Sequence, residues 1–132
     1  MTDILVKNAR VIDGSQDRPS DAIDIRLSDG HVQEVGASLS APDTATVIDA
    51  KNSFVMPGLI DAHVHVNAQN ANLKENAALP DAIATVGTMN LMQAMLARGF
   101  TTVRDLGGAS GPLRKAMEMA PIQLPRLNIC GK

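Results

Sequence analysis

Two histidines one residue apart are the side chains in this sequence best suited to metal chemistry. His63 and His65 lie within the apolar stretch from Val55 to Val66, and Asp61 precedes the first of them by two residues. We predict a strand here, on which side chains alternate, so that Asp61, His63 and His65 share one face. Imidazoles placed in this way can bind one metal ion such as zinc. The H-x-H spacing alone is weak, because ordinary surface and core histidines also produce it.

The residues around the pair make the pattern specific. The chain reads P-G-L-I-D-A-H-V-H from Pro57 to His65. This resembles the first barrel strand of the amidohydrolase superfamily, whose metal-dependent hydrolases carry P-G-[LF]-I-D-x-H-x-H at the end of that strand. The resemblance implies that His63 and His65 bind a divalent metal, expected to be zinc, with one or two ions in the complete enzyme. It also implies that Asp61 supports these ligands without binding the metal, or serves as a structural acid.

Length and composition set the outer bounds on function. At 132 residues the chain is long enough for one domain with a substantial core. Nucleic-acid-binding proteins use basic surfaces and aromatic stacking platforms. The net charge of −2 and the aromatic content of 2% do not favour either feature in this chain. Every apolar stretch is shorter than the roughly 20 residues of a membrane span, and the start lacks the layout of a secretory signal. We therefore predict a cytoplasmic protein without nucleic-acid or membrane partners, in which the single cysteine, Cys130, is buried.

Residues 1–56 are predicted to form short strands joined by turns. Two short strands are expected around a turn at Asn8, and a hairpin at Asp29-Gly30, where Gly supplies the positive φ that such a turn requires. Further strands are expected over residues 22–27, 31–35 and 46–48. His31 beside the hairpin is expected to be exposed to solvent and is excluded from the site.

Beyond Val66 the hydrophobic pattern becomes helical. Residues 67–79 are predicted to be a loop, and a helix is predicted to start at Pro80-Asp81 and to stop before Gly99. The apolar residues that recur at helical spacing in it are Val86, Met89, Met92 and Leu96. The elements expected after it are a strand within residues 99–108, a helix over residues 113–119 and a strand over residues 126–130.

The resulting order of strands and helices, β-α-β-α-β, predicts a right-handed parallel arrangement. We therefore predict an α/β protein in which residues 57–132 form the first three strands of an incomplete (β/α)8 barrel of the TIM type. The resemblance to amidohydrolases implies that residues 1–56 belong to a small β-sandwich, which strands from the far C-terminus complete in that family. In such barrels the chemistry lies at the carboxyl ends of the strands, where His63 and His65 are expected.

Arg104 and Asp105 are expected at the carboxyl end of the second barrel strand. Strand alternation leaves open which of them faces the barrel interior, and they either pair with each other or support the metal ligands. The loop from Gly107 to Gly111 either cradles an anion on free amides or reflects turn geometry alone. The phrase G-F-T-T-V-R-D-L-G-G is shared with imidazolonepropionase-like and dipeptidase-like amidohydrolases, and it narrows the resemblance to that branch.

The resemblance implies a hydrolase of C–N bonds in small amides, cyclic amides or dipeptides, with metal-activated water as the nucleophile. In the family the other ligands come from later strands, and Lys132 precedes the strand that carries the bridging lysine. We therefore expect no catalytic residue within this chain, no activity of the chain alone, and a need for self-association or for the rest of the barrel. The alternative is a non-catalytic, truncated scaffold that binds metal weakly or serves as an interaction module.

Overall fold

The computed structural model describes residues 3–131. The chain divides into two compact units, one ending at Pro57 and the other starting at Gly58. Among the described residues, the first unit is built from strands and loops, and the second alternates strands with helices. The predicted α/β class is therefore confirmed. No helix within the described residues combines the length and the apolar composition that a membrane crossing requires.

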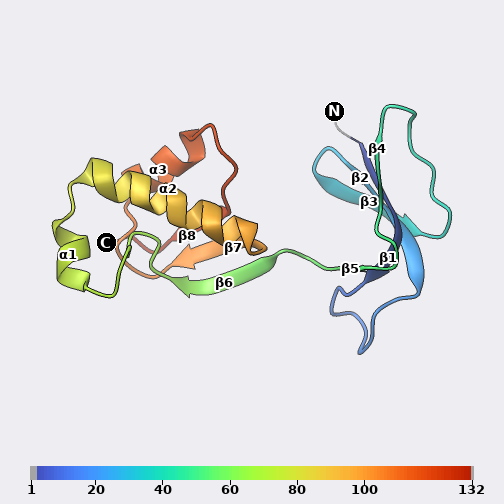
Figure 1. Cartoon of the computed structure of the whole chain (residues 1–132), viewed down its shortest axis with the longest axis horizontal. Coiled ribbons are helices and arrows are strands. Elements are labelled where there is room, and N and C mark those ends of the chain that lie inside the picture. Colours follow the sequence, from blue (N-terminus) through green and yellow to red (C-terminus); the bar gives the residue numbers. More distant parts are fainter. Residues whose placement is uncertain (1–2, 132) are drawn as a thin grey trace. The chain divides into compact units, whose positions relative to one another are not determined.

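The first unit is a five-stranded sheet organised around its first strand (Figure 1). The strands are β1 (Ile4–Val11), β2 (Ala22–Ser28), β3 (His31–Gly36), β4 (Thr46–Asp49) and β5 (Phe54–Val55). β1 pairs antiparallel with β2 and parallel with both β4 and β5, while β3 pairs antiparallel with β2. The hairpin between β2 and β3 turns at Asp29 and Gly30, with φ angles of +52° and +74°, which confirms the predicted turn.

The two short strands expected around Asn8 form one continuous strand, so that prediction is wrong. The pairing of β1 with β2 shifts register between Val6 and Ala9, and Asn8 has a φ of +55°. The backbone N–H of Asn8 donates to Oδ1 of the buried Asp24, 3.1 Å away. Because this carboxylate accepts the N–H at the bulge, the strand continues through Asn8 rather than turning there.

The second unit is a three-stranded parallel sheet with strand order β6-β7-β8, and α2 lies along it (Figure 1). Its elements are β6 (Leu59–Val64), α1 (Leu73–Ala78), α2 (Asp81–Ala97), β7 (Phe100–Asp105), α3 (Gly111–Met119) and β8 (Arg126–Ile129). The buried core between sheet and helices contains Val66, Met92, Met95, Val103, Ala109, Met117 and Leu127. This core fixes the face of the sheet that α2 and α3 cover, and it leaves the other face for the chemistry.

Helix α1 lies within residues 67–79, which were predicted to be a loop, so that prediction is wrong over Leu73–Ala78. Asn72 caps the helix, because its Oδ1 accepts the backbone N–H of Glu75 at 3.3 Å. A helix this short ends before an apolar repeat can be recognised in the sequence.

Helix α2 starts at Asp81 as predicted, and its buried face coincides in part with the apolar residues expected at helical spacing. Met92 is buried and Met89 packs against the core, whereas Val86 is 57% exposed and Thr88 and Met95 are buried in addition. Apolar residues occur on all sides of this helix, so their spacing alone could not select the face that packs on the sheet.

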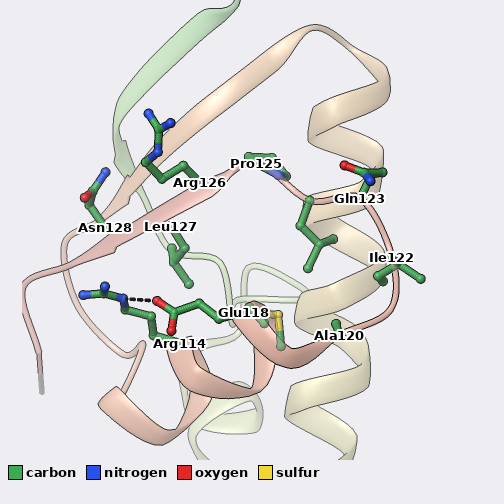
Figure 2. Close-up of a pocket in the computed structure, with 11 residues that line it drawn as sticks. Arg114, Glu118, Ala120, Ile122, Gln123, Pro125, Arg126, Leu127 and Asn128 are labelled. Carbon is green, nitrogen blue, oxygen red and sulfur yellow. Dashed lines mark hydrogen bonds and ion pairs between the residues drawn. The ribbon is translucent and has the colours of Figure 1, made fainter. Parts of the chain in front are cut away.

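Strand β8 shows how the sheet separates two environments. Leu127 is buried toward the helices, while Arg126 and Asn128 are exposed and project to the other side of the strand (Figure 2). Cys130, predicted to be buried, is exposed, because it follows Ile129, the last β8 residue paired with β7.

Candidate metal centre

His65 follows β6 directly and bonds to the loop after β7. Its ring Nδ1 lies 3.0 Å from the carbonyl oxygen of Gly107. A carbonyl oxygen can only accept, so this contact is a hydrogen bond when Nδ1 carries the proton, and Nε2 of a neutral ring then keeps its lone pair. A histidine held in this way is ready to bind a metal through Nε2. Sequence reasoning missed Gly107, because a backbone carbonyl acceptor has no signature in residue type.

His63 places a second imidazole beside the first. The ring centroids of His63 and His65 are 5.7 Å apart, and the ring planes meet at 77°. Both residues are exposed. The two rings have the donor type that zinc prefers, and their role as ligands stays a prediction.

Asp61 departs from strict strand alternation. Asp61 pairs with Val103 and Val64 pairs with Asp105, so three steps along β6 match two steps along β7. This bulge interrupts the period of two, and the expected single face shared by Asp61 and the histidines no longer follows from strand geometry. Instead, Oδ1 of Asp61 accepts the backbone N–H of His63 at 3.1 Å. Asp61 therefore holds the backbone at the first histidine.

Arg104 acts on the same segment of backbone. Its side chain is exposed, and its Nε donates to the carbonyl oxygen of Ala62, 3.0 Å away. Among the described residues it forms no ion pair with Asp105, which removes one of the two roles that the sequence left open. Arg104 therefore contacts the backbone of the bulge between Asp61 and Val64.

Asp105 is fully buried and accepts three backbone N–H groups. Its Oδ2 accepts the N–H of Val66 at 2.8 Å, and its Oδ1 accepts those of Gly107 at 2.9 Å and Ala109 at 3.1 Å. Asp105 thus lies on the helix side of β7, whereas Arg104 lies on the exposed side. Two amides of the glycine loop are already paired with this carboxylate, which favours turn geometry over an anion cradle.

Two hollows border the second unit. One, of about 330 Å³, lies between α3 and the segment that leads into β8, and Nε of Arg114 donates to Glu118 at 2.8 Å within it (Figure 2). It lies at the amino end of β8, away from the strand ends that carry the histidines. The other, of about 700 Å³, is lined by residues of α1, the start of α2 and the segment leading into α3, together with Asn67 and Gly108. Asn67 lies two residues after His65, and neither histidine lines either of these two hollows.

His63 and His65 are suitable metal ligands by type, but two ligands are too few for a complete site. A structural zinc site nearly always has four protein ligands, and a catalytic one has three plus water. Within residues 3–131, no cluster of three or more His, Cys, Asp or Glu side chains could hold a metal ion. The described residues therefore offer two suitable imidazoles, and a complete site would need ligands from elsewhere.

Comparison with known proteins decides the family. Residues 54–132, which include β6 and both histidines, match the amidohydrolase family. The chain belongs to this family. The resemblance drawn from the run between Pro57 and His65 is therefore confirmed.

The amidohydrolase chain also superposes closely on solved structures. A crystal structure of an amidohydrolase covers 98% of it with a TM-score of 0.90 and 40% identity. A crystal structure of a prolidase complexed with N-methylphosphonate-L-proline covers 98% with a TM-score of 0.89 and 35% identity. A dihydroorotase from Citrifermentans bemidjiense is 38% identical over 107 residues, which is 81% of this chain. The chain spans 32% of each solved chain and 22% of the dihydroorotase.

Proposed function

We propose that this chain contributes the first metal ligands of a hydrolase that breaks C–N bonds in small amides, cyclic amides or dipeptides. The observation that carries the proposal is the bond from His65 Nδ1 to the Gly107 carbonyl, which leaves Nε2 free beside the ring of His63. Membership of the amidohydrolase family supports it.

His63 and His65 would hold the divalent metal, expected to be zinc, together with ligands from other segments. When bound, such a metal lowers the pKa of a water molecule and polarises the carbonyl that is attacked. The residues of this chain position the two rings. Asp61 and Arg104 bond to the His63 N–H and the Ala62 carbonyl, the two ends of one peptide unit within the bulge, and the Gly107 carbonyl contacts His65. The acid or base that handles the proton is expected from later strands.

We further propose that residues 57–132 form the first three strands of a (β/α)8 barrel, and that residues 1–56 form part of a β-sandwich. The parallel order β6-β7-β8, with helices between the strands, supports the barrel. The similarity to a solved amidohydrolase and a prolidase over 98% of the chain supports both parts.

The substrate is proposed to be a cyclic amide or a dipeptide. One curated relative is a dihydroorotase, and the solved prolidase is complexed with N-methylphosphonate-L-proline. The loops that choose between such substrates are expected to follow later strands of the barrel. A non-catalytic metal-binding module is the alternative, and the presence of only two imidazole donors favours it for the isolated chain.

Calorimetric titration with zinc tests the metal site. We expect weak binding to the chain, because two imidazoles fill only part of the coordination sphere. The His63→Ala, His65→Ala double variant should lose this binding, and His31→Ala, in the other unit, should keep it. Equal affinity of the double variant and the unsubstituted chain would refute the assignment.

A hydrolysis assay tests whether catalysis depends on later strands. With added zinc, the 132-residue chain is expected to show no turnover of dipeptides or cyclic amides, because it lacks further ligands and a base. Light scattering after size exclusion is expected to show self-association, because β8 has an unpaired edge. A monomer with zinc-dependent turnover that requires His63 and His65 would contradict the expected dependence on later strands.

A further inference from the structure

We propose that Asp105 is a positioning residue that acts through Gly107 to select the tautomer of His65, and thereby the ring nitrogen that remains available to a metal. The tautomer part stands on the geometry of this chain alone. Its consequence for metal binding rests on the proposed function.

The first step is the contact of His65 with Gly107. An exposed imidazole that meets only water can carry its proton on either nitrogen. The carbonyl of Gly107, 3.0 Å from Nδ1, accepts a hydrogen bond when Nδ1 carries the proton and so favours the Nδ1–H form. This bond is exposed, so water competes for both partners, and it selects one tautomer only if the carbonyl is held in place.

The second step is the anchoring of that carbonyl. The N–H of Gly107 and that of Ala109 both donate to Oδ1 of Asp105. The loop is therefore fixed at Gly107 itself and again two residues later. Hydrogen bonds to an ionised acceptor are about twice as strong as neutral ones, and this acceptor is shielded from water because Asp105 is 0% exposed.

The third step is the anchoring of the backbone next to His65. Oδ2 of Asp105 accepts the N–H of Val66, the residue directly after His65. One carboxylate thus fixes the backbone next to the imidazole with one oxygen and the loop that carries its acceptor with the other. The two loops also lie close together at Gly108, where an added Cβ would lie 2.6 Å from Oδ1 of Asn67.

Asp105→Asn is the sharpest perturbation, because it is nearly isosteric and removes one of the two acceptor oxygens. If the remaining oxygen faces Gly107 and Ala109, the new NH₂ group opposes the N–H of Val66. If the amide is reversed, the NH₂ group opposes the two loop N–H groups instead. In either orientation one of the two loops loses its anchor.

The test is the tautomer of His65, read from the nitrogen-15 shifts of the imidazole rings in metal-free protein at a pH where the rings are neutral. We expect Nδ1–H in the unsubstituted protein and a mixture of tautomers in Asp105→Asn. His31 is the matched control, because its Nδ1 bonds to the Asp29 carbonyl at 2.9 Å without any link to Asp105. Its tautomer should not change.

Two results would overturn the proposal. One is a mixed tautomer of His65 in the unsubstituted protein, which needs no variant to fold. The other is an unchanged Nδ1–H tautomer in folded Asp105→Asn. Zinc affinity, measured on the same samples, is expected to fall in proportion to the Nδ1–H fraction of His65, about twofold for an even mixture. A changed tautomer with unchanged zinc affinity would support the positioning role and would refute Nε2 of His65 as the metal-binding atom.

Discussion

Replacing Gly108 with alanine is expected to destabilise the second unit by about 2–4 kcal/mol, which combines a backbone term and a steric term. Gly108 has a φ of +108°, a region that residues with a Cβ rarely adopt, and such a conformation costs about 1–3 kcal/mol. The added Cβ would also lie 2.6 Å from Oδ1 and 2.7 Å from Nδ2 of Asn67. The contacted amide is the end of a side chain that can turn aside, so the steric cost should be near the lower end, about 1 kcal/mol.

A double-mutant cycle separates the two terms. Asn67→Ala removes the three atoms nearest to the new Cβ, so it should recover about 1 kcal/mol of the loss in Gly108→Ala and leave the backbone term. The matched control is Gly111→Ala in the same loop. Gly111 begins α3, lacks a positive φ, and has no atom within 4 Å of an added Cβ. It should be neutral or stabilise by up to about 1 kcal/mol.

Urea unfolding followed by circular dichroism at a helical wavelength measures these changes. Within the described residues all helices lie in the second unit, so the helical signal reports on that unit. A loss below about 0.5 kcal/mol in Gly108→Ala would refute the backbone argument. Nearly full recovery in the double variant would show that sterics, rather than φ, decides the cost.

Two further predictions concern the core and the first unit. Met92→Ala should destabilise by about 2–5 kcal/mol in the same unfolding assay because Met92 is 0% exposed, whereas Met119→Ala, at a site 73% exposed, should change stability by less than about 0.5 kcal/mol. The pKa of Asp49 is lowered below its ordinary value of 3.8, first by the hydrogen bond from the Asn8 side chain. The ionised carboxylate therefore stabilises the folded protein above pH 3.8, and this stabilisation is lost as the pH falls through the lowered pKa. Asn8→Gly keeps the positive φ and should raise the pKa of Asp49 toward 3.8 in a carboxyl NMR titration, while the pKa of Asp13, lowered by Ser15, should stay unchanged.

Local sequence signals predicted much of the fold correctly. The hairpin at Asp29-Gly30 follows from the positive φ that glycine adopts without strain, and the start of α2 at Asp81 follows from the preceding proline and the acidic first turn. The parallel strands followed from the alternation of strand and helix patterns. These signals act over a few residues of chain, so they can be read without knowing which segments pack together.

The sequence-based predictions were wrong where the local structure depends on a residue far away in the chain. The strand through Asn8 continues because Asp24, 16 residues later, accepts its N–H, and the bulge in β6 is set by pairing with β7. The buried face of α2 depends on which side meets the sheet, since its sequence is apolar all round.

The sequence by itself predicted that two histidines lie at the end of one strand and that an arginine and an aspartate end the next one, although the first of these strands is largely exposed rather than buried. Only the tertiary structure decided that Asp105 is buried beneath the loops and that Arg104 holds the exposed bulge. The bonds that carry these roles join Asp105 to Val66 across 39 residues and His65 to Gly107 across 42. Their acceptors and donors are largely backbone groups, which every residue possesses, so only the packing of β6 against β7 selects the ones that meet.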